Sequence, residues 1–253
     1  MGYELPGIYG SGSLHLDSCR GSGWLGLLRA MLQMRLVTAL LVKDEADRYL
    51  TRVLQRCLEF SDEVLVLDDG STDDTVKIAQ DLGCLVKQRP QSGMWGNEST
   101  ARAELWERGA KLAKDGWLLI CDADMILEGN PRDLIQTWDV GIWAFVLWDC
   151  WDGEHQARID GPWQHGPMIP RPWLFRPSIC VDGAPQWSQR PLHTGHAPLN
   201  LVGVGAIAPP ETYFWRHLAY AKKEDRVRKH AQYMDKAPLL TEFEAAHAAS
   251  IND

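Results

Sequence analysis

Residues 36–70 read LVTALLVKDEADRYLTRVLQRCLEFSDEVLVLDDG, and this stretch decides the fold class. The runs at 36–42 and 63–69 are short, mainly apolar and rich in β-branched residues, which is typical of strands buried on both faces. Between them, apolar residues recur at helical spacing, and Asp44 is placed to cap the helix. A strand, a helix and a second strand joined by short connections predict parallel pairing through a right-handed crossover.

The same alternation continues as far as residue 121. Residues 71–83 (STDDTVKIAQDLG) predict a helix that is opened by a capping box between Ser71 and Asp74 and closed by Gly83. Residues 84–88 predict a third strand, residues 97–112 a helix, and residues 117–121 (WLLIC) a fourth strand. We therefore expect an α/β fold with a mostly parallel central sheet.

Acidic residues follow three of the predicted strands. They are Asp44 and Glu45 after the first strand, Asp68 and Asp69 at the end of the second, and Asp122 and Asp124 after the fourth. Ligands of open parallel sheets bind outside the carboxyl ends of the strands, so we expect these side chains to share one crevice. An unpaired buried carboxylate is costly, so water, a basic side chain or a metal ion must compensate them. The pair Asp122 and Asp124 can offer oxygens to one hard cation, or one oxygen to the cation and one to a ribose.

The composition changes after residue 131. Proline, glycine and tryptophan become frequent, an apolar stretch covers residues 199–208, and a basic amphipathic helix follows within residues 211–236. Tryptophan suits a flat ligand such as a sugar or a base, although it is more often simply a core residue. The basic helix could meet phosphates of an acceptor, whereas a solvated helix face is the simpler interpretation.

Charge and cysteine content narrow the class of protein. The 253 residues carry a net charge of −8, which disfavours non-specific binding of nucleic acid across the whole surface. Six scattered cysteines without C-x-x-C spacing indicate reduced thiols and a cytoplasmic location. No run of about 18 apolar residues is present, which argues against a transmembrane helix. Cys180, His193 and His196 could be read as a zinc site, but the spacing to a fourth ligand is missing.

Taken together, residues 36–83, 97–105 (NESTARAEL) and 117–127 (WLLICDADMIL) resemble the family 2 glycosyltransferases. The resemblance implies the GT-A fold, a three-layer sandwich around a mostly parallel sheet. It also assigns binding roles: Val42, Glu45, Asp68 and Asp69 for the nucleoside, Arg102 for the diphosphate, Asp122 for ribose or metal, and Asp124 for metal. Arg102 is followed by Ala103 where relatives carry Asn, and a solvent-facing helical arginine is the plain alternative.

The second half resembles the family more loosely. Residues 171–177 (RPWLFRP) are similar to a strand seen in a subset of these enzymes, and residues 215–233 (WRHLAYAKKEDRVRKHAQY) look like their closing segment. A histidine of that segment commonly completes the metal site, which implies His217 as a third ligand, and imidazole is a reasonable ligand for manganese. A packed or surface histidine is the alternative.

The resemblance also implies the domain organisation. Residues 1–34 are expected to form an N-terminal tail with a short apolar helix. Residues 35–253 are expected to form one GT-A domain, divided into a nucleotide-binding half (35–130), an acceptor half (131–236) and a tail (237–253).

The implied activity is metal-dependent transfer of a sugar from a nucleotide diphosphate sugar, a UDP-sugar foremost, to an acceptor hydroxyl with inversion. The cofactor would be Mn²⁺ or Mg²⁺, which neutralises charge on the leaving diphosphate. A base must deprotonate the acceptor, and the candidates are Asp182, His193 and Asp152, with Asp149 also possible. The acceptor stays open between a glycan, a modified nucleobase in DNA, a lipid-linked sugar and a protein.

Two other classes of protein deserve comparison. A non-catalytic carbohydrate-binding or scaffold protein derived from such an enzyme has no need of Asp68, Arg102, Asp122 and Asp124 together. A nucleotidyltransferase would carry a Gly-rich, basic loop after the first strand, and residues 42–49 (VKDEADRY) are not such a loop. The absence of a Gln-x-x-Arg-Trp motif argues against a processive polysaccharide synthase.

Overall fold

The computed structural model describes residues 2–4, 34–89, 98–136, 140–190, 193–235 and 240–252. The tail and apolar helix predicted for residues 1–34 therefore lie outside the described residues, apart from residues 2–4 and Met34, which is buried. Strand β1 (Gly2–Glu4) pairs antiparallel with β8 (Gln156–Arg158). These first residues are thus part of the sheet structure rather than of a tail.

The remaining elements follow the alternation of strands and helices that the sequence predicts up to residue 121 and become irregular afterwards. The strands are β2 (Leu36–Val42), β3 (Glu63–Asp68), β4 (Leu85–Gln88), β5 (Trp117–Asp122), β6 (Met125–Leu127), β7 (Ile142–Asp149), β9 (Arg171–Phe175), β10 (Gly205–Ile207) and β11 (Phe214–His217). The helices are α2 (Leu50–Phe60), α3 (Thr75–Asp81), α4 (Glu98–Ala113), α5 (Pro131–Leu134), α6 (His165–Met168), α7 (Lys223–Asp235) and α8 (Glu242–Ala249). Short 3₁₀ helices are η1 (Gly161–Gln164), η2 (Leu218–Tyr220) and η4 (Ser250–Asn252).

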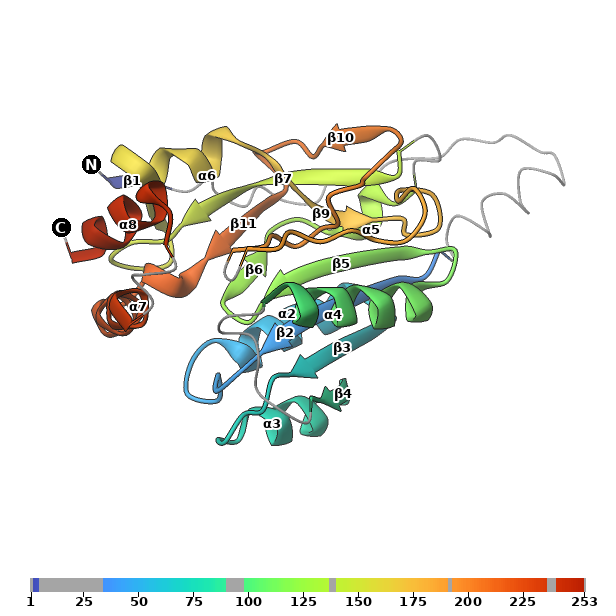
Figure 1. The fold of residues 1–253 in the computed structure, drawn as a ribbon, viewed down its shortest axis with the longest axis horizontal. Helices are drawn as coiled ribbons and strands as arrows, with labels where there is room; N and C mark the ends of the chain where they lie inside the picture. The colour runs from blue at the N-terminus through green and yellow to red at the C-terminus, as the bar shows by residue number, and fades with distance from the viewer. Residues whose placement is uncertain are drawn as a thin grey trace, which may run out of the picture.

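Most of these strands form one large sheet in the order β4-β3-β2-β5-β9-β7-β11-β6, with β10 paired to the first part of β7. Strand β2 pairs in parallel with β3 and β5, and β4 pairs in parallel with β3. Strand β9 runs antiparallel to both β5 and β7, so β7 and its parallel neighbour β11 point the same way as β5. The carboxyl ends of β2, β3, β5, β7 and β11 consequently lie at one edge of the sheet (Figure 1).

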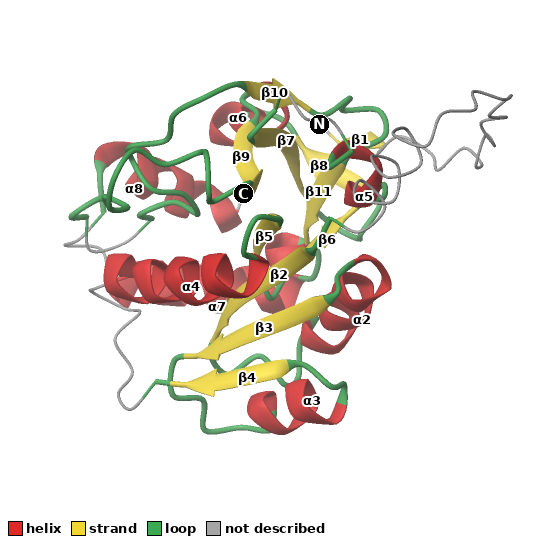
Figure 2. Cartoon of the chain, turned by 90° about the vertical axis from the view of Figure 1, so that its right-hand side faces the viewer, coloured by secondary structure: helices red, strands yellow, loops and turns green. Residues whose placement is uncertain are grey.

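Helices cover both faces of the first half of the sheet. Figure 2 shows α4 on one side of β2 and β3, and α2 and α3 on the other. Alternate residues of β2 divide between two cores: Leu40 packs with Leu50 and Leu54 of α2, whereas Ala39 packs with Leu105 of α4. All residues of β2 are buried, as predicted for a strand covered on both faces. The predicted α/β class, a mostly parallel sheet between helical layers as in the GT-A fold, is confirmed.

Two predicted helix caps are wrong. Helix α2 begins at Leu50, and Asp44 lies in the preceding loop with a φ of 51°, where its carboxylate accepts from the backbone N–H of Thr72 at 2.7 Å. Ser71 does not cap α3, which begins at Thr75; its hydroxyl accepts instead from the backbone N–H of Asp44 at 2.9 Å. Both side chains therefore join two loops rather than open a helix.

The C-terminal residues form a helix where the sequence indicates a tail. Helix α8 opens with a capping box between Thr241 and Glu244. Ala248 and, in η4, Ile251 are buried together with Trp163 in a third, smaller core. Within the segment 237–253 expected as a tail, residues 242–252 are therefore helical.

Two expectations concern the described residues as a whole. No helix among them is long and apolar enough to cross a membrane. The described cysteines are all buried with free thiols: Cys57, Cys84, Cys121, Cys150 and Cys180.

Candidate active site

The first group of acids lies at the ends of β3, β2 and β5. In the register of the sheet, Asp68 stands opposite Val42, and Asp122 stands opposite Leu41. Two carboxylates from strands far apart in the sequence thus flank the end of β2, as the sequence predicts for a parallel sheet.

The second half of the sheet brings further groups to the same edge. Asp149, the last residue of β7, stands opposite His217, the last residue of β11. The backbone N–H of Leu218 donates to the carbonyl of Asp124 at 2.7 Å, which ties the turn after β5 to the end of β11. Asp124 is therefore the point where the two halves of the site meet.

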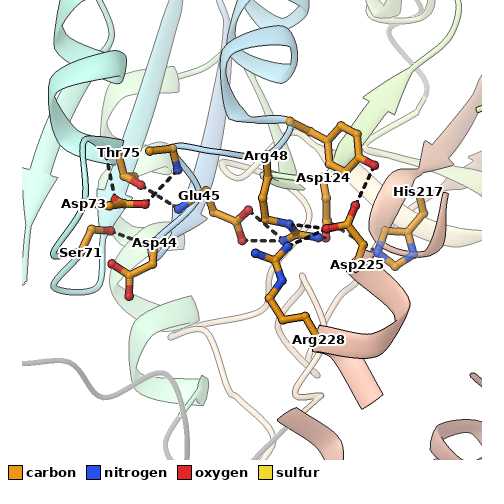
Figure 3. Close-up of polar contacts among 12 residues, drawn as sticks. Asp44, Glu45, Arg48, Ser71, Asp73, Thr75, Asp124, His217, Asp225 and Arg228 are labelled. Atoms are coloured by element: carbon orange, nitrogen blue, oxygen red, sulfur yellow. Dashed lines mark hydrogen bonds and ion pairs between the residues drawn. The ribbon is translucent and has the colours of Figure 1, made fainter. Parts of the chain in front are cut away.

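The loop between β2 and α2 is held by side chains of the β3–α3 loop (Figure 3). The hydroxyl of Thr75 accepts from the backbone N–H of Glu45 at 2.7 Å. The carboxylate of Asp73 accepts from the backbone N–H of Ala46 at 3.0 Å. The acidic segment GSTDDT (70–75) thus fixes a backbone turn, and this turn directs the Glu45 side chain towards the centre of the site.

Arg48 lies at the centre of a cluster of carboxylates (Figure 3). Its Nη1 donates to both carboxylate oxygens of Glu45 at 3.0 and 2.9 Å. Its Nε donates to Oδ1 of Asp225 on α7 at 3.3 Å, and its Nη2 lies 3.5 Å from Oδ2 of Asp124. The hydroxyl of Tyr49 also donates to Asp225, at 2.8 Å. One guanidinium therefore joins the β2–α2 loop, the β5–β6 turn and helix α7.

Glu45 has a raised pKa. Burial raises its pKa to about 7, and the nearby charge of Asp124 adds to the rise, while Arg48 opposes it. A carboxyl group with a pKa near neutrality, in contact with a positive side chain, indicates an excess of negative charge in this part of the site.

Asp124, His217 and Asp149 form a chain across the site. Nδ1 of His217 lies 2.6 Å from Oδ1 of Asp149, and Nε2 lies 3.6 Å from Oδ1 of Asp124. Burial lowers the pKa of His217, but the two carboxylates outweigh that effect and raise it to about 9. Burial alone would raise the pKa of Asp124, whereas His217, Lys229 and Arg48 hold it below its usual value. The chain orients one imidazole nitrogen towards Asp124.

Asp122 has a different set of partners. Its Oδ1 lies 2.9 Å from Nη1 of Arg102, and its Oδ2 lies 2.9 Å from Nε2 of His196. Arg102 is buried on α4, and its Nε also donates to Glu98 at 3.0 Å. Burial raises the pKa of Asp122, but Arg102 and His196 outweigh it and hold the pKa well below its usual value. The ring of His196 packs against Trp173 with centroids 4.0 Å apart. Basic side chains therefore compensate Asp122.

The acids at the end of β3 are engaged in local structure. Asp68 is fully buried, and its carboxylate accepts from the backbone N–H groups of Gly70 and Ser71 at 3.2 Å each. Asp69 is also fully buried and forms an ion pair with Arg89, and its backbone N–H donates to the carbonyl of Val42 at 2.9 Å. The structure brings Val42, Asp68 and Asp69 together at the strand ends; their nucleoside-binding role stays a prediction.

The three candidate bases lie in separate surroundings. Asp152 has a side chain 66% exposed and accepts from Arg226 at 2.7 Å. Asp182 is exposed, and its backbone carbonyl accepts from the side-chain amide of Asn200 at 2.6 Å. His193 has a φ of 53° and stacks on Tyr233 of α7, with ring centroids 5.7 Å apart. The structure does not collect them into one cluster, and the choice of base stays a prediction.

The donor set around Asp124 fits a divalent cation. A carboxylate and an imidazole nitrogen face each other at 3.6 Å, and Asp149 supports the histidine from behind. Among the described residues no three His, Cys, Asp or Glu side chains gather as a preformed metal site, which also leaves the zinc reading of Cys180, His193 and His196 without support. Two protein ligands are sufficient for Mg²⁺ in sites where substrate phosphates supply the rest. Asp124 and His217 would hold the ion, while Asp122 is engaged by Arg102.

The fold and the strand-end acids together define an α/β protein with a charged site at the carboxyl edge of its sheet. Residues 41–136 match the family model described as Glycosyl transferase family 2. Over these residues the chain is similar to the family 2 glycosyltransferases, as the sequence resemblance indicates.

Curated relatives include proteins named as glycosyltransferases. An uncharacterized glycosyltransferase of Rickettsia felis is 36% identical over 97 residues, which is 38% of this chain and 31% of that relative. An uncharacterized protein of Mycobacterium tuberculosis is 32% identical over 212 residues, which is 78% of this chain and 50% of that relative. The chain spans a third to a half of the length of the curated relatives it matches.

Two solved structures are similar to the chain. The crystal structure of a mycobacterial protein has a TM-score of 0.41 at 18% identity, covering 61% of this chain and 57% of the other. Glucosyl-3-phosphoglycerate synthase from Mycobacterium tuberculosis, in complex with Mn²⁺, UDP and glucosyl-3-phosphoglycerate, has a TM-score of 0.35 at 21% identity. The aligned region covers 53% of this chain and 50% of the synthase chain.

The site contains residues whose roles the sequence does not predict. Arg48 lies two residues before helix α2, where an arginine is usually solvated. The sequence suggests His196 only as a zinc ligand and Asp149 only as a possible base, and Asp225 lies in the half with little periodicity. Their places depend on pairings between residues far apart in the sequence, so no local pattern could have identified them.

Proposed function

We propose that this protein is a divalent-cation-dependent glycosyltransferase that moves a sugar from a nucleotide diphosphate sugar to an acceptor hydroxyl with inversion. The observation that carries the proposal is the approach of Asp124 to His217, with Nε2 and Oδ1 3.6 Å apart and Asp149 behind the ring. A carboxylate and a supported imidazole suit Mn²⁺ or Mg²⁺. The match of residues 41–136 to the family 2 model supports the same interpretation.

Each side chain has a defined part in this proposal. Asp124 and His217 hold the cation, which when bound supplies charge neutralisation at the departing diphosphate. Arg102, kept in place by Glu98 and Asp122, adds a fixed positive charge on the diphosphate side. Because Arg102 is buried and doubly anchored, it needs little reorganisation during the reaction.

The transfer itself is a single displacement. The acceptor oxygen forms a bond to the anomeric carbon while the bond between that carbon and the diphosphate oxygen breaks, and the hydroxyl proton passes to a base. Of the three candidate bases, His193 is an exposed imidazole stacked on Tyr233, and its partial desolvation lowers its pKa, which favours the neutral form that accepts a proton. Asp152 and Asp182 stay candidates, and the donor is proposed to be a UDP-sugar.

Donor turnover tests the proposal directly. Release of nucleoside diphosphate is measured from a panel of nucleotide sugars, with Mn²⁺, with Mg²⁺ and with chelator. We expect hydrolysis of at least one donor with metal, none with chelator, and a loss of about 100-fold or more in Asp124→Ala, because a positioned charge in such a site is worth several kcal/mol. Asp115→Ala, an exposed acid in the turn after α4, is the matched control.

Three results would argue against the proposal. If the wild type neither turns over nor binds any nucleotide sugar, the protein is not a glycosyltransferase. Binding without turnover, with metal and across acceptors, favours a non-catalytic carbohydrate-binding protein. Wild-type activity in Asp124→Ala refutes the cation assignment while leaving the transferase reading in place.

A further inference from the structure

We infer that Arg48 is a positioning residue that serves as the counter-ion of Asp124 in the cation-free protein and gives up that contact when the cation binds. The inference rests on the proposed function, because it needs a divalent cation at Asp124. It assigns a role to a residue that the family comparison and the acids of the site do not explain.

Arg48 is built into the site. Its side chain is 11% exposed, and it bridges carboxylates of three separate segments, as Figure 3 shows: Glu45, Asp124 and Asp225. A guanidinium in contact with three acids is held far more firmly than one in a single surface pair. The position of the Arg48 guanidinium is therefore fixed by the site itself.

The contact with Asp124 is the one that can be released. The distances to Glu45 are 2.9 and 3.0 Å, and the distance to Asp225 is 3.3 Å, whereas Nη2 lies 3.5 Å from Asp124. Arg48 therefore keeps its two closer partners if it moves off Asp124. Breaking the longest of three ion pairs costs least, since the charge stays paired.

A cation and Arg48 compete for the same carboxylate. Oδ1 of Asp124 faces His217 and Oδ2 faces Arg48, so both oxygens have a positively charged or polar neighbour. Two like charges beside one carboxylate repel each other strongly at low dielectric. Binding of a divalent ion therefore favours a position of the Arg48 guanidinium nearer Glu45 and Asp225. Because Asp225 lies on α7, this shift would strengthen the contact between Arg48 and that helix.

The matched test is Mn²⁺ binding by Arg48→Gln and Arg52→Gln, measured by the loss of the free-ion electron paramagnetic resonance signal. Arg52 lies one turn further along α2 and pairs with Glu154 at 2.6 Å, so its removal deletes the same charge outside the cluster. We expect Arg48→Gln to bind Mn²⁺ about fivefold to tenfold more tightly than the wild type, because a competing charge next to the ligand is gone. Arg52→Gln should bind as the wild type does.

A second variant should change the affinity for Mn²⁺ in the opposite direction. Asp225→Asn removes one of the alternative partners of Arg48, so Arg48 should hold Asp124 more firmly and Mn²⁺ should bind about threefold or more weakly. In the Arg48→Gln background the same substitution should have a much smaller effect, since it acts through Arg48. A merely structural role for Arg48 would weaken binding in both single variants.

The outcomes separate the two claims. Wild-type protein without saturable Mn²⁺ binding, alone or with UDP, overturns the proposed function and this inference with it. Wild-type binding together with equal or weaker binding by Arg48→Gln overturns the inference alone. If Arg48→Gln does not fold, Asp225→Asn and Arg48→Lys decide: tighter binding by Asp225→Asn contradicts the competition between Arg48 and the cation.

Discussion

The two halves of the sheet contribute opposite chemistry to the same edge. The first half supplies the carboxylates of Asp122 and Asp124, and the second half supplies a histidine to each. Nε2 of His196 lies 2.9 Å from Asp122, and Nε2 of His217 lies 3.6 Å from Asp124. Each carboxylate thus contacts a histidine of the second half in addition to an arginine of the first half, Arg102 for Asp122 and Arg48 for Asp124, so both halves contribute side chains to the site.

The largest effect is expected at the pairing between Asp122 and Arg102. Asp122→Asn removes the charged partner of a buried guanidinium, which typically costs about 3–5 kcal/mol. We expect about 3 kcal/mol, because Glu98 still pairs with Arg102 at 3.0 Å. Urea unfolding measures the change, with Asp115→Asn as the exposed control. A loss below about 0.5 kcal/mol, the usual range of surface substitutions, would mean that Asp122 contributes little to holding Arg102 in the folded protein.

The next effect concerns the second half alone. Asp149→Asn should weaken Mn²⁺ binding about 10-fold to 100-fold, because loss of the carboxylate that orients a ligating histidine has effects of this size. The distance of 2.6 Å between Asp149 and His217 makes this contact the main support of the ring. Calorimetric titration of Mn²⁺ in the presence of UDP provides the measurement. Unchanged affinity with an intact fold would show that His217 needs no support from β7.

The smallest effect is a dependence of stability on pH that belongs to the C-terminal helix. His247 on α8 packs against Trp163 with centroids 4.1 Å apart, and burial lowers its pKa to about 4. In the unfolded chain the pKa of this residue is about 6.5. Below that pH the imidazole is therefore protonated in the unfolded chain while it stays neutral in the folded protein. The free energy of unfolding should therefore fall as the pH falls from about 6.5 to about 4, by about 1–2 kcal/mol after solvent screening of the half-buried ring is taken into account.

The matched variant for this effect is His247→Gln, which cannot titrate. Its unfolding free energy, measured by urea between pH 7 and pH 4.5, should fall less than that of the wild type. Equal slopes in the two proteins would show that α8 does not keep His247 neutral and that the third core is not closed around it.

The sequence predicts the first half of this molecule well, for a physical reason. Strand β2 is buried along its whole length and α2 follows at once, so hydrophobic periodicity and short connections define the parallel sheet. The acids at the ends of β2, β3 and β5 are likewise predictable, since parallel strands must end at one edge. What a local pattern cannot show is which base meets which acid.

The second half shows where sequence reasoning fails. Strand β7 is bordered by β9, β10 and β11, which lie up to about 75 residues away along the chain, so its pairing cannot be read locally. Asp44 and Ser71, predicted as helix caps, hold a loop instead. His217 was predicted by resemblance to a family motif, whereas the partners of Asp149 and His196 and the place of Asp225 needed the structure.

The central claim is that Asp124 and His217, one from each half, hold a single divalent cation. Titration of Mn²⁺ in the presence of UDP into the wild type, Asp124→Asn, His217→Gln and the double variant tests it most directly. The account predicts that each single variant binds about tenfold or more weakly and that the double variant is little worse than the weaker single, because ligands of one ion are not independent. Wild-type affinity in His217→Gln, or full additivity in the double variant, would contradict it.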